Sequence, residues 1–418
     1  MMNNRRDIRM KKVLVVGGGA AGLVAAIFAA REGAAVTILE RTDRVGKKIL
    51  ATGNGRCNMT NIDCHISYFH GTSPKFALGP LTAFDQNMAI QFFEELGISH
   101  KVEGGGKVYP CSDQASSVLD VLRMEIDRLK IETLVDKEVS QISKDKNGFR
   151  VACKDQTSYM SDTVIVATGG KASPNLGSDG SGLALLERLG HKIITPFPSL
   201  VHIILDTPVV KKIKGVKIQG KVTIKDVNGS QQEERGEILF TEDGISGPPV
   251  FQVSRVVGAQ KMKKNTCQVY LDLFPDHTPQ ELEIMLQMRI AYQPQKSLGD
   301  FLIGLLNKRL ISQILKAAGL TDLSRLASTL SPKEIMKLVY VLKEWRFTAI
   351  GTRLWPSAQV MAGGIATCDV YPKTLESKKV PGLYIVGELL DIDGDCGGFN
   401  LQWAWSSAYV AGTNAALS

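Results

Sequence analysis

The stretch KKVLVVGGGAAGLVAAIFAAREGAAVTILE, residues 11–40, decides the fold. It begins with the β-branched apolar run Val13–Val16, continues with a helical pattern over Ala20–Glu32, and ends in a second β-branched run at Val36–Glu40. A strand, a helix and a strand within about 30 residues are typical of a βαβ unit in a doubly wound α/β fold. The sequence therefore predicts a Rossmann-type unit in this stretch.

Three glycines of this unit occupy the positions of a dinucleotide-binding turn. Gly17 permits the tight turn, Gly19 lets backbone approach a pyrophosphate, and Gly22 lets the helix pack closely on the strand. Glu40, at the end of the second strand, can accept hydrogen bonds from ribose hydroxyls and would repel a 2′-phosphate. We therefore predict a site for FAD or NAD, not NADP, formed by Gly17, Gly19, Ala20, Ala21, Gly22, Glu40 and Arg41.

Later segments favour FAD over NAD. A glycine-rich, basic loop at 46–58 suits a long anionic ligand, and a buried strand at 162–168 ends at paired glycines. A loop at 397–402 starts a helix whose N–H groups can stabilise negative charge on a flavin. The further predicted FAD contacts are Gly46, Lys47, Lys48, Gly53, Asn54, Gly55, Arg56, Cys57, Asn58, Val139, Ala167, Thr168, Gly169, Gly170, Gly387, Glu388, Gly397, Gly398, Phe399, Asn400 and Leu401.

These motifs resemble those of the BaiN/RdsA family of flavoproteins, also called the aminoacetone oxidase family. The resemblance covers essentially the whole chain, including LFTEDGISGP at 239–248, and the chain departs from the family at Cys396, where the family has Thr. It implies an α/β fold with a Rossmann-type two-part FAD-binding domain of the glutathione-reductase type, interrupted by an inserted β-barrel-like domain with a helical appendage. It also implies that there is no separate NAD(P)H-binding domain.

The texture of the sequence suggests where these parts begin and end. Short alternating strands and an Asn228-Gly229 turn follow His191, helical spacing follows Pro279, and Tyr384 begins another buried strand. We predict an FAD-binding domain of residues 1–190 and 356–418, an inserted β domain of 191–275 and 344–355, and a helical subdomain of 276–343.

The net charge of +8 lies in the predicted insertion. Residues 191–355 hold 23 Lys and Arg against 15 Asp and Glu, a net of +8, so the rest of the chain is neutral. The lysines gather as Lys211, Lys212, Lys214, Lys217, Lys221 and Lys225, and as Lys261, Lys263 and Lys264. Such clusters indicate either a solvated surface or a patch for an acidic partner such as an RNA backbone.

Two cysteines are candidates for catalysis. The resemblance places the loop around Cys57 near the reactive edge of the flavin, where a thiol could donate a proton after hydride addition to a double bond. Cys396 stands beside the predicted flavin-facing glycines. The alternative for both is inert packing of a small side chain. Arg56 fits a phosphate or carboxylate anchor better than a proton donor, because a guanidinium stays protonated.

Three functions remain open at this point. The first is an FAD-dependent oxidoreductase that reduces a C=C bond of an unsaturated substrate, such as uridine in ribosomal RNA, by hydride transfer from reduced flavin. The second is a flavin oxidase of a small amine such as aminoacetone that uses O₂. The third is a non-catalytic, flavin-stabilised RNA-binding protein. The expected partners are a small-molecule or RNA substrate, which would meet the basic insertion, and an external electron donor or O₂.

The remaining patterns bear on compartment and metals. The seven scattered cysteines predict reduced thiols, and the six histidines show no metal-ligand spacing, so no metal site is expected. The uncharged run Val13–Ala30 follows Lys11 and Lys12 and at first resembles an export signal. Its consecutive glycines contradict a helical signal core. We therefore expect a cytoplasmic protein without a membrane anchor.

Overall fold

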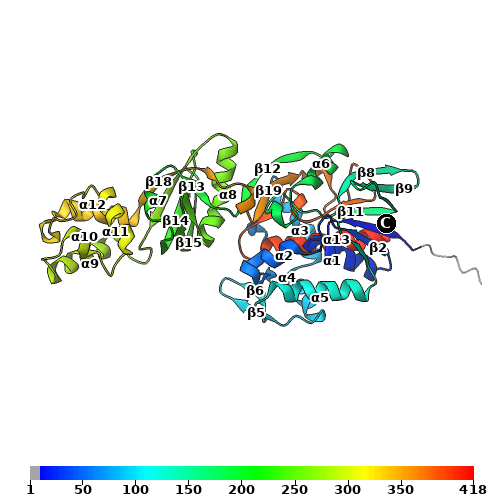
Figure 1. Cartoon of the computed structure of the whole chain (residues 1–418), viewed down its shortest axis with the longest axis horizontal. Helices are drawn as coiled ribbons and strands as arrows, with labels where there is room; N and C mark the ends of the chain where they lie inside the picture. Colours follow the sequence, from blue (N-terminus) through cyan, green and yellow to red (C-terminus); the bar gives the residue numbers. More distant parts are fainter. Residues whose placement is uncertain (1–9) are drawn as a thin grey trace, which may run out of the picture. The chain divides into compact units, whose positions relative to one another are not determined.

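The computed structural model describes residues 10–418, which form two compact units. The first unit comprises the chain up to Phe197 together with Gln359–Ser418. The second comprises Pro198–Ala358. The chain therefore leaves its first unit, builds the second, and returns to complete the first (Figure 1).

A five-stranded parallel sheet is the centre of the first unit. Its strand order is β20 (Leu383–Ile385), β11 (Thr163–Val166), β1 (Lys12–Val16), β2 (Ala35–Leu39) and β7 (Glu132–Leu134). The β-branched and leucine side chains of Val13–Val16 are all at most 3% exposed, as expected for a strand covered on both faces. Because β20 comes from the C-terminal segment, the sheet joins residues more than 200 positions apart.

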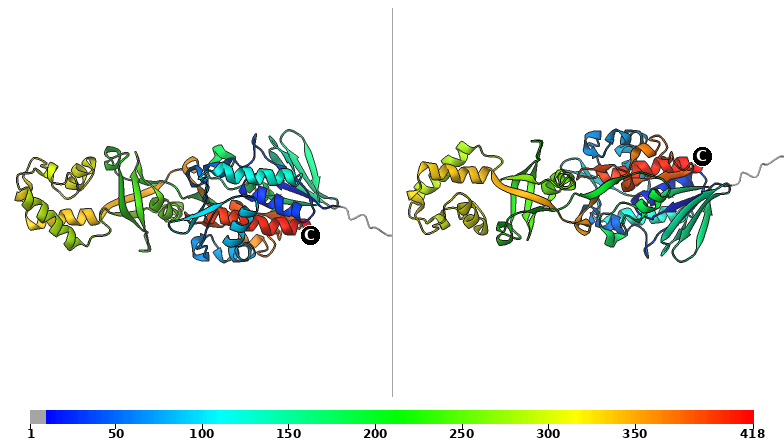
Figure 2. Two further views of the ribbon diagram at one scale, coloured as in Figure 1. Left: turned by 90° about the horizontal axis from the view of Figure 1, so that it is seen from below. Right: turned by 90° about the horizontal axis from the view of Figure 1, so that it is seen from above.

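Two helices on this sheet approach each other closely. The red α13 (Phe399–Leu417) runs alongside the blue α1 (Ala20–Arg31) in Figures 1 and 2. A Cβ added at Gly412 would lie 2.4 Å from the carbonyl oxygen of Ala25, and one added at Gly22 would lie 1.8 Å from that of Gly17. No side chain fits at either point, so glycine is required where helix meets helix and where helix meets turn.

Smaller elements surround the sheet. A two-residue turn at 146–147 joins β8 to β9, and α5 begins at Ala115. The additional strands and helices of this unit are β3 (Thr60–Asn61), β4 (Phe69–His70), β5 (His100–Glu103), β6 (Lys107–Pro110), β8 (Val139–Asp145), β9 (Gly148–Cys153), β10 (Ser158–Ser161), β12 (Ile193–Ser199), β19 (Val360–Ile365), β21 (Asp393–Gly394), α2 (Lys47–Ala51), α3 (Leu78–Ala83), α4 (Gln86–Glu95), α5 (Ala115–Arg128) and α6 (Ser181–Arg188).

The second unit contains a closed antiparallel barrel. Its strands follow the order β13 (Ile203–Leu205), β16 (Gly244–Ser246), β15 (Gln231–Phe240), β14 (Lys217–Lys225), β17 (Cys267–Asp272) and β18 (Trp345–Thr352). Alternate residues such as Val222, Ile224 and Phe240 are fully buried, while their neighbours in sequence are more exposed. This period of two is typical of strands with one face toward a core.

Helices complete the second unit: α7 (Val209–Lys212), α8 (Pro248–Met262), α9 (Pro279–Tyr292), α10 (Leu298–Phe301), α11 (Lys308–Ala317) and α12 (Pro332–Lys343). Capping boxes start two of them, Thr278 with Glu281 at α9 and Ser331 with Glu334 at α12. Barrel and helices share one continuous apolar core. The predicted architecture, a two-part Rossmann-type domain with an inserted barrel and helical appendage, is thus observed.

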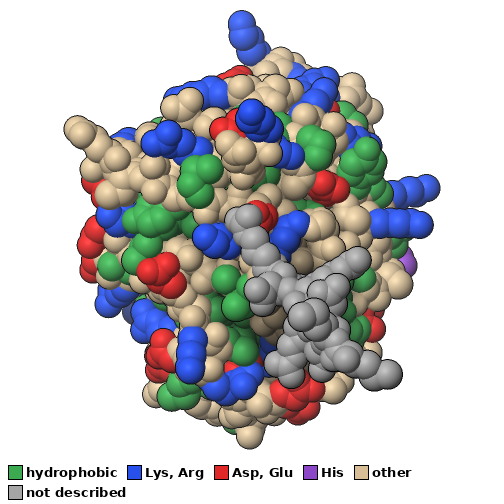
Figure 3. Space-filling model, turned by 90° about the vertical axis from the view of Figure 1, so that its right-hand side faces the viewer, with side chains coloured by type: hydrophobic (Ala, Val, Ile, Leu, Met, Phe, Trp, Pro, Cys, Tyr) green, Lys and Arg blue, Asp and Glu red, His purple; other side chains and the backbone are tan. Residues whose placement is uncertain are grey.

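The uncharged run Val13–Ala30 forms β1, the glycine turn and most of α1. Within residues 10–418, no helix has both the length and the apolar character needed to cross a membrane. On the face of the first unit that carries β8 and β9, basic and acidic side chains are interspersed (Figure 3).

Candidate flavin site

The turn between β1 and α1 holds an open space at the N-terminus of a helix. Gly17 has a φ of 104°, which favours glycine, and a Cβ at Gly19, the N-cap of α1, would meet nothing within 4 Å. The first N–H groups of a helix have no partner inside it. This turn therefore offers backbone donors and room for an anionic group, as a pyrophosphate requires.

Glu40 is fixed beside this turn. Its Oε2 accepts a hydrogen bond of 2.8 Å from the Gly18 amide, and its Oε1 accepts one of 2.8 Å from the Thr42 amide. The side chain is 9% exposed. Each carboxylate oxygen keeps a further lone pair, so Glu40 can still accept from ribose hydroxyls as predicted.

The loop after β2 is shaped by left-handed backbone. A Cβ at Gly46 would lie 2.2 Å from Leu119 Cδ1. Gly53, Asn54 and Gly55 have φ values of 56°, 57° and 85°, and Cys57 has 61°. The Cys57 amide donates to the Thr52 carbonyl at 3.0 Å and closes the loop. These turns explain the density of glycine in the motif.

Glu388 brings together three segments that the sequence predicted to contact FAD. Its Oε2 lies 2.7 Å from Lys48 Nζ and accepts from the Gly170 amide at 3.3 Å. Its Oε1 accepts from the Met361 amide at 2.8 Å. The loop after β2, the end of β11 and the segment after β20 therefore meet at one carboxylate.

The N-terminus of α13 adjoins the end of the same loop. Gly398, its N-cap, has a φ of 103°, and a Cβ there would lie 2.5 Å from the Thr60 carbonyl oxygen and 3.0 Å from Asn58 Oδ1. Asn61 Nδ2 donates to the Gly397 carbonyl at 3.0 Å. Gln402 Oε1 accepts from Thr60 Oγ1 at 2.6 Å. Asn61 and Gln402 were not predicted as site residues, because their side chains hydrogen-bond other residues of the loops instead of pointing to a ligand motif.

Asn58 tests whether a flavin suits this place. Its side chain is 9% exposed, and its Oδ1 is buried without a hydrogen-bond partner among the described residues. A buried acceptor without a partner costs about 1–3 kcal/mol. An amide-like N–H, such as that of a flavin pyrimidine ring, would satisfy it, and the positive end of α13 would stabilise negative charge on that ring. The donor set, the glycine turns and this acceptor fit a flavin dinucleotide.

Several predicted contacts have other partners in the structure. Arg56 donates to Glu103 and Asp113 at 2.5–3.1 Å, and these two carboxylates raise its pKa. Lys47 pairs with Asp43, and Arg41 lies 2.5 Å from Asp179. These cations are already neutralised, so they are weaker candidates for binding phosphate than the backbone of the turn.

The remaining predicted contacts fall into two groups. Val139 is buried at the start of β8, and Ala167 and Thr168 follow β11 directly behind the Gly17 turn. In the first turn of α13, the Phe399 ring stacks on that of Tyr68 with 4.5 Å between the ring centroids. The Asn400 side-chain amide accepts from the Gly394 N–H and donates to the Gly394 carbonyl, and Leu401 is half-buried. In this turn the backbone N–H groups are therefore better candidates than the side chains.

The two candidate cysteines differ in environment. Cys57 is fully buried, and burial raises the pKa of its thiol to about 12 despite a hydrogen bond with Thr52. Cys396 is half-buried and lies close enough to Tyr109 to affect its titration. All seven cysteines are free thiols. Within the described part of the chain, no group of three or more His, Cys, Asp or Glu residues is placed to hold a metal ion.

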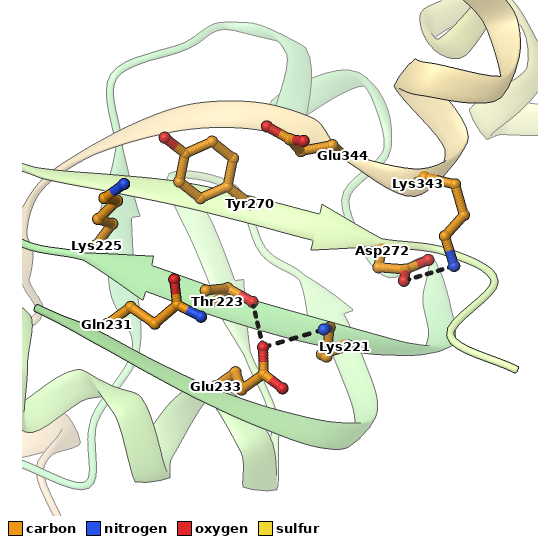
Figure 4. Close-up of a pocket in the computed structure, with 9 residues that line it drawn as sticks. All are labelled: Lys221, Thr223, Lys225, Gln231, Glu233, Tyr270, Asp272, Lys343 and Glu344. Atoms are coloured by element: carbon orange, nitrogen blue, oxygen red, sulfur yellow. Dashed lines mark hydrogen bonds and ion pairs between the residues drawn. The ribbon is translucent and has the colours of Figure 1, made fainter. Parts of the chain in front are cut away.

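A hollow on the barrel of the second unit is lined by charges of both signs (Figure 4). Lys221 lies 3.0 Å from Glu233, and Lys343 lies 2.8 Å from Asp272. Elsewhere in this unit, Lys214 pairs with Glu242 and Lys217 with Glu237, both at 2.9 Å. Three of the six lysines predicted to cluster at 211–225 thus have a glutamate partner.

Another group of cations in this unit forms no ion pair with the residues that the structure describes, although Lys211 lies close enough to Glu242 to help lower the pKa of that carboxyl. Lys211, Lys212, Lys308 and Arg309 are exposed, and none forms an ion pair with a described residue. Arg309 Nη2 donates to the Lys212 carbonyl at 3.1 Å, which joins α7 to the start of α11. These four residues, which we call the unpaired basic cluster, are a candidate surface for a polyanion.

Comparisons with known proteins agree with this architecture. The family model described as HI0933-like protein Rossmann domain matches residues 11–414. A 3-dehydro-bile acid delta(4,6)-reductase of Clostridium scindens is 40% identical, over 97% of this chain and 99% of its own length. Ribosomal RNA dihydrouridine synthases of Haemophilus influenzae and Escherichia coli are 32% and 31% identical, each over 95% of this chain and 96% of their own length. The chain therefore belongs to the HI0933-like family, which includes the BaiN/RdsA proteins, and it is an FAD-dependent oxidoreductase.

Proposed function

We propose that this protein reduces a C=C bond conjugated to a carbonyl group. The observation that carries the proposal is the 40% identity, over nearly the full length of both chains, to a protein named as a delta(4,6)-reductase. The more distant relatives named as dihydrouridine synthases support the same reaction type, because dihydrouridine is uridine with its ring C=C bond saturated. In both substrates the double bond is conjugated to a carbonyl.

The residues proposed to hold the cofactor divide by the part of FAD that each suits. The amides of the Gly17–Gly22 turn suit the pyrophosphate, and Glu40 suits the adenosine ribose. Asn58 and the first amides of α13 suit the flavin ring. When bound and reduced, FAD would supply the hydride. An external hydride donor, such as a dihydronicotinamide nucleotide, would have to recharge it.

The substrate class is the second part of the proposal, and the unpaired basic cluster favours RNA. Lys211, Lys212, Lys308 and Arg309 are four exposed cations that form no ion pair with the described residues. A reductase of a small steroid has no need of such a surface, whereas an RNA backbone binds to one through its phosphates. The closer similarity to the bile-acid reductase supports a small substrate instead. The two are distinguished by experiment.

The experiment is an anaerobic half-reaction. Purified protein is loaded with FAD, reduced with a limiting amount of dithionite, and mixed with a steroid whose C=C bonds are conjugated to a 3-oxo group, or with unmodified ribosomal RNA fragments. Reoxidation of the flavin together with a saturated product, identified by mass spectrometry, supports the proposal. Reoxidation by neither probe, with rapid flavin reduction by aminoacetone and reoxidation by O₂, would instead favour an amine oxidase.

A further inference from the structure

Tyr109 occupies a place in the candidate flavin site that the sequence did not reveal. It lies on β6, whose neighbours are β3 and β5, and it is 9% exposed. A Cβ at Gly53 would lie 3.3 Å from its ring Cε1, and the guanidinium carbon of Arg56 lies 4.1 Å from its ring centroid. The ring is thus held by the same loop that is proposed to bind the flavin.

The hydroxyl group of Tyr109 is not used by the fold. It makes no hydrogen bond with the residues that the structure describes, although Arg56, Glu103, Asp113 and Cys396 are close enough to influence it. The carboxylates of Glu103 and Asp113 are instead bound to Arg56 and Lys101. By contrast, the hydroxyl of the buried Tyr384 donates to the Asn414 carbonyl at 3.3 Å.

The surroundings keep this hydroxyl protonated at neutral pH. Burial raises the pKa of Tyr109, and the positive charge of Arg56 opposes that shift in part. The titratable groups that act on it are Arg56 from the loop, Glu103 from β5, Asp113 after β6 and Cys396 from the segment before α13. Lys101 of β5 pairs with Glu103 and Asp113. A phenol in this state can donate a proton to a basic carbon.

We propose that Tyr109 is the proton donor for the reduction. The inference rests on the proposed function, in which a hydride is added to the carbon β to the carbonyl and a proton to the carbon α to it. The O–H bond of Tyr109 breaks as the new C–H bond at the α carbon forms, and the electron pair of the O–H bond stays on the phenolate oxygen. Water then returns a proton to the phenolate. Tyr109 thereby competes with Cys57, whose thiol is fully buried and held by Thr52.

The first test replaces the hydroxyl alone. Tyr109→Phe keeps the ring between Gly53 and Arg56 and leaves no hydrogen-bond partner unsatisfied, so the holoprotein should bind FAD as the parent does. Reduction of its flavin by dithionite should be unchanged, and oxidation of the reduced flavin by the unsaturated substrate should slow by about 10²-fold or more. Tyr384→Phe, also a buried tyrosine, is the matched control and should oxidise at the parent rate.

A second measurement does not depend on turnover. In an alkaline titration followed by tyrosinate absorbance, Tyr109→Phe should remove one tyrosine that ionises late. Arg56→Gln should move that ionisation to still higher pH, since the positive charge that lowers the pKa of Tyr109 is gone. Placing 3,5-difluorotyrosine, a more acidic phenol, at position 109 should move to lower pH the point at which turnover is lost, because the donor must be protonated.

The outcomes separate the inference from the function on which it rests. If the parent protein reduces neither probe, the proposed function fails. If the parent turns over and Tyr109→Phe matches it, Tyr109 is not the donor, and a loss in Cys57→Ala would assign that role to the thiol. An unshifted pH profile with difluorotyrosine also overturns the inference, even if Tyr109→Phe were to fold poorly.

Discussion

The two units of this protein are stabilised in different ways. In the first, backbone passes close to backbone at glycines such as Gly22 and Gly412, and most of the buried polar side chains, Asn58 and Gln402 among them, lie here. In the second, a closed barrel and its helices surround one apolar core, and the uncompensated charge is outside. The first is therefore organised around a polar ligand, whereas the second forms its core without one.

The largest expected effect comes from replacing Gly22 or Gly19 of the same turn by Ala. The first change should prevent folding, and the second should prevent only FAD binding. Gly22→Ala places a Cβ against the Gly17 carbonyl oxygen, so the turn has to move, and we expect loss of folded protein. Gly19→Ala meets no atom within 4 Å, so the fold should persist while FAD is lost from the space the methyl group enters. Circular dichroism measures the fold, and released flavin measures the ligand. Equal behaviour of both variants would contradict the assignment of that space to FAD.

The second prediction asks whether FAD stabilises one unit or both. Cys57 in the first unit and Cys267 in the second are buried thiols whose pKa values burial raises, to about 12 and about 11. Both should resist alkylation near neutral pH until their unit opens. FAD at 100 times its Kd should raise the free energy of opening of the first unit by about 2.7 kcal/mol and slow the labelling of Cys57 accordingly. The labelling rate of Cys267 should not change. Mass spectrometry of the labelled peptides measures both labelling rates. If FAD protects Cys57 and Cys267 equally, the two units open together.

A third, smaller effect concerns the adenosine end of the cofactor. Glu40→Ala removes the acceptor of the Gly18 and Thr42 amides and of the proposed ribose contact, so FAD binding should weaken by about 1–3 kcal/mol. Isothermal titration of apoprotein with FAD measures the change. Glu125, a carboxylate of the same unit that pairs with Arg31 and Arg128, is the comparison, and Glu125→Ala should lower stability without changing FAD affinity. Unchanged affinity in Glu40→Ala would show that the ribose is held elsewhere.

The smallest expected effect tests the charge of the second unit. Lys211→Ala, Lys212→Ala and Arg309→Ala together should flatten the slope of log affinity against log salt for ribosomal RNA fragments by up to about 2, taking about 0.7 per phosphate contact. The control replaces Lys214, Lys217 and Lys221 by Ala, the same number of cations but each paired with a glutamate. It should change the slope less. Equal slopes in parent and both triple variants would exclude RNA from the unpaired basic cluster.

The sequence predicted what is decided locally. The Gly17–Gly22 turn, the glycine loop and the Asn228-Gly229 turn between β14 and β15 each follow from a few adjacent residues. The inserted barrel was implied by the family resemblance and not by these local motifs. The assignment of individual FAD contacts and of catalytic cysteines stays a prediction. So does the division at 190/191 and 355/356; the compact units of the structure meet at 197/198 and 358/359.

What the sequence could not predict depends on distant partners. Arg56 was expected to bind an anionic ligand, but its partners Glu103 and Asp113 lie 47 and 57 positions further along the chain. Tyr109 joins the site only because β6 pairs with β3, which brings it beside the loop. Closure of the barrel similarly needs Ile203 opposite Thr352. No local pattern encodes such pairings.

The contact of α13 with α1 also has a consequence for the order of events on the ribosome. The segment that makes the barrel and its helices is synthesised in full before Phe399–Leu417 exists. During that interval α1 lacks the helix that covers it. Gly397 and Gly398, which are proposed to line the same site as the Gly17–Gly22 turn, have not yet been synthesised. A nascent chain can therefore bury the barrel core early but can complete the flavin site only after Phe399–Leu417 has been synthesised. We expect FAD to be acquired after this point, so a shortage of flavin during growth should leave a chain whose inserted unit is already folded.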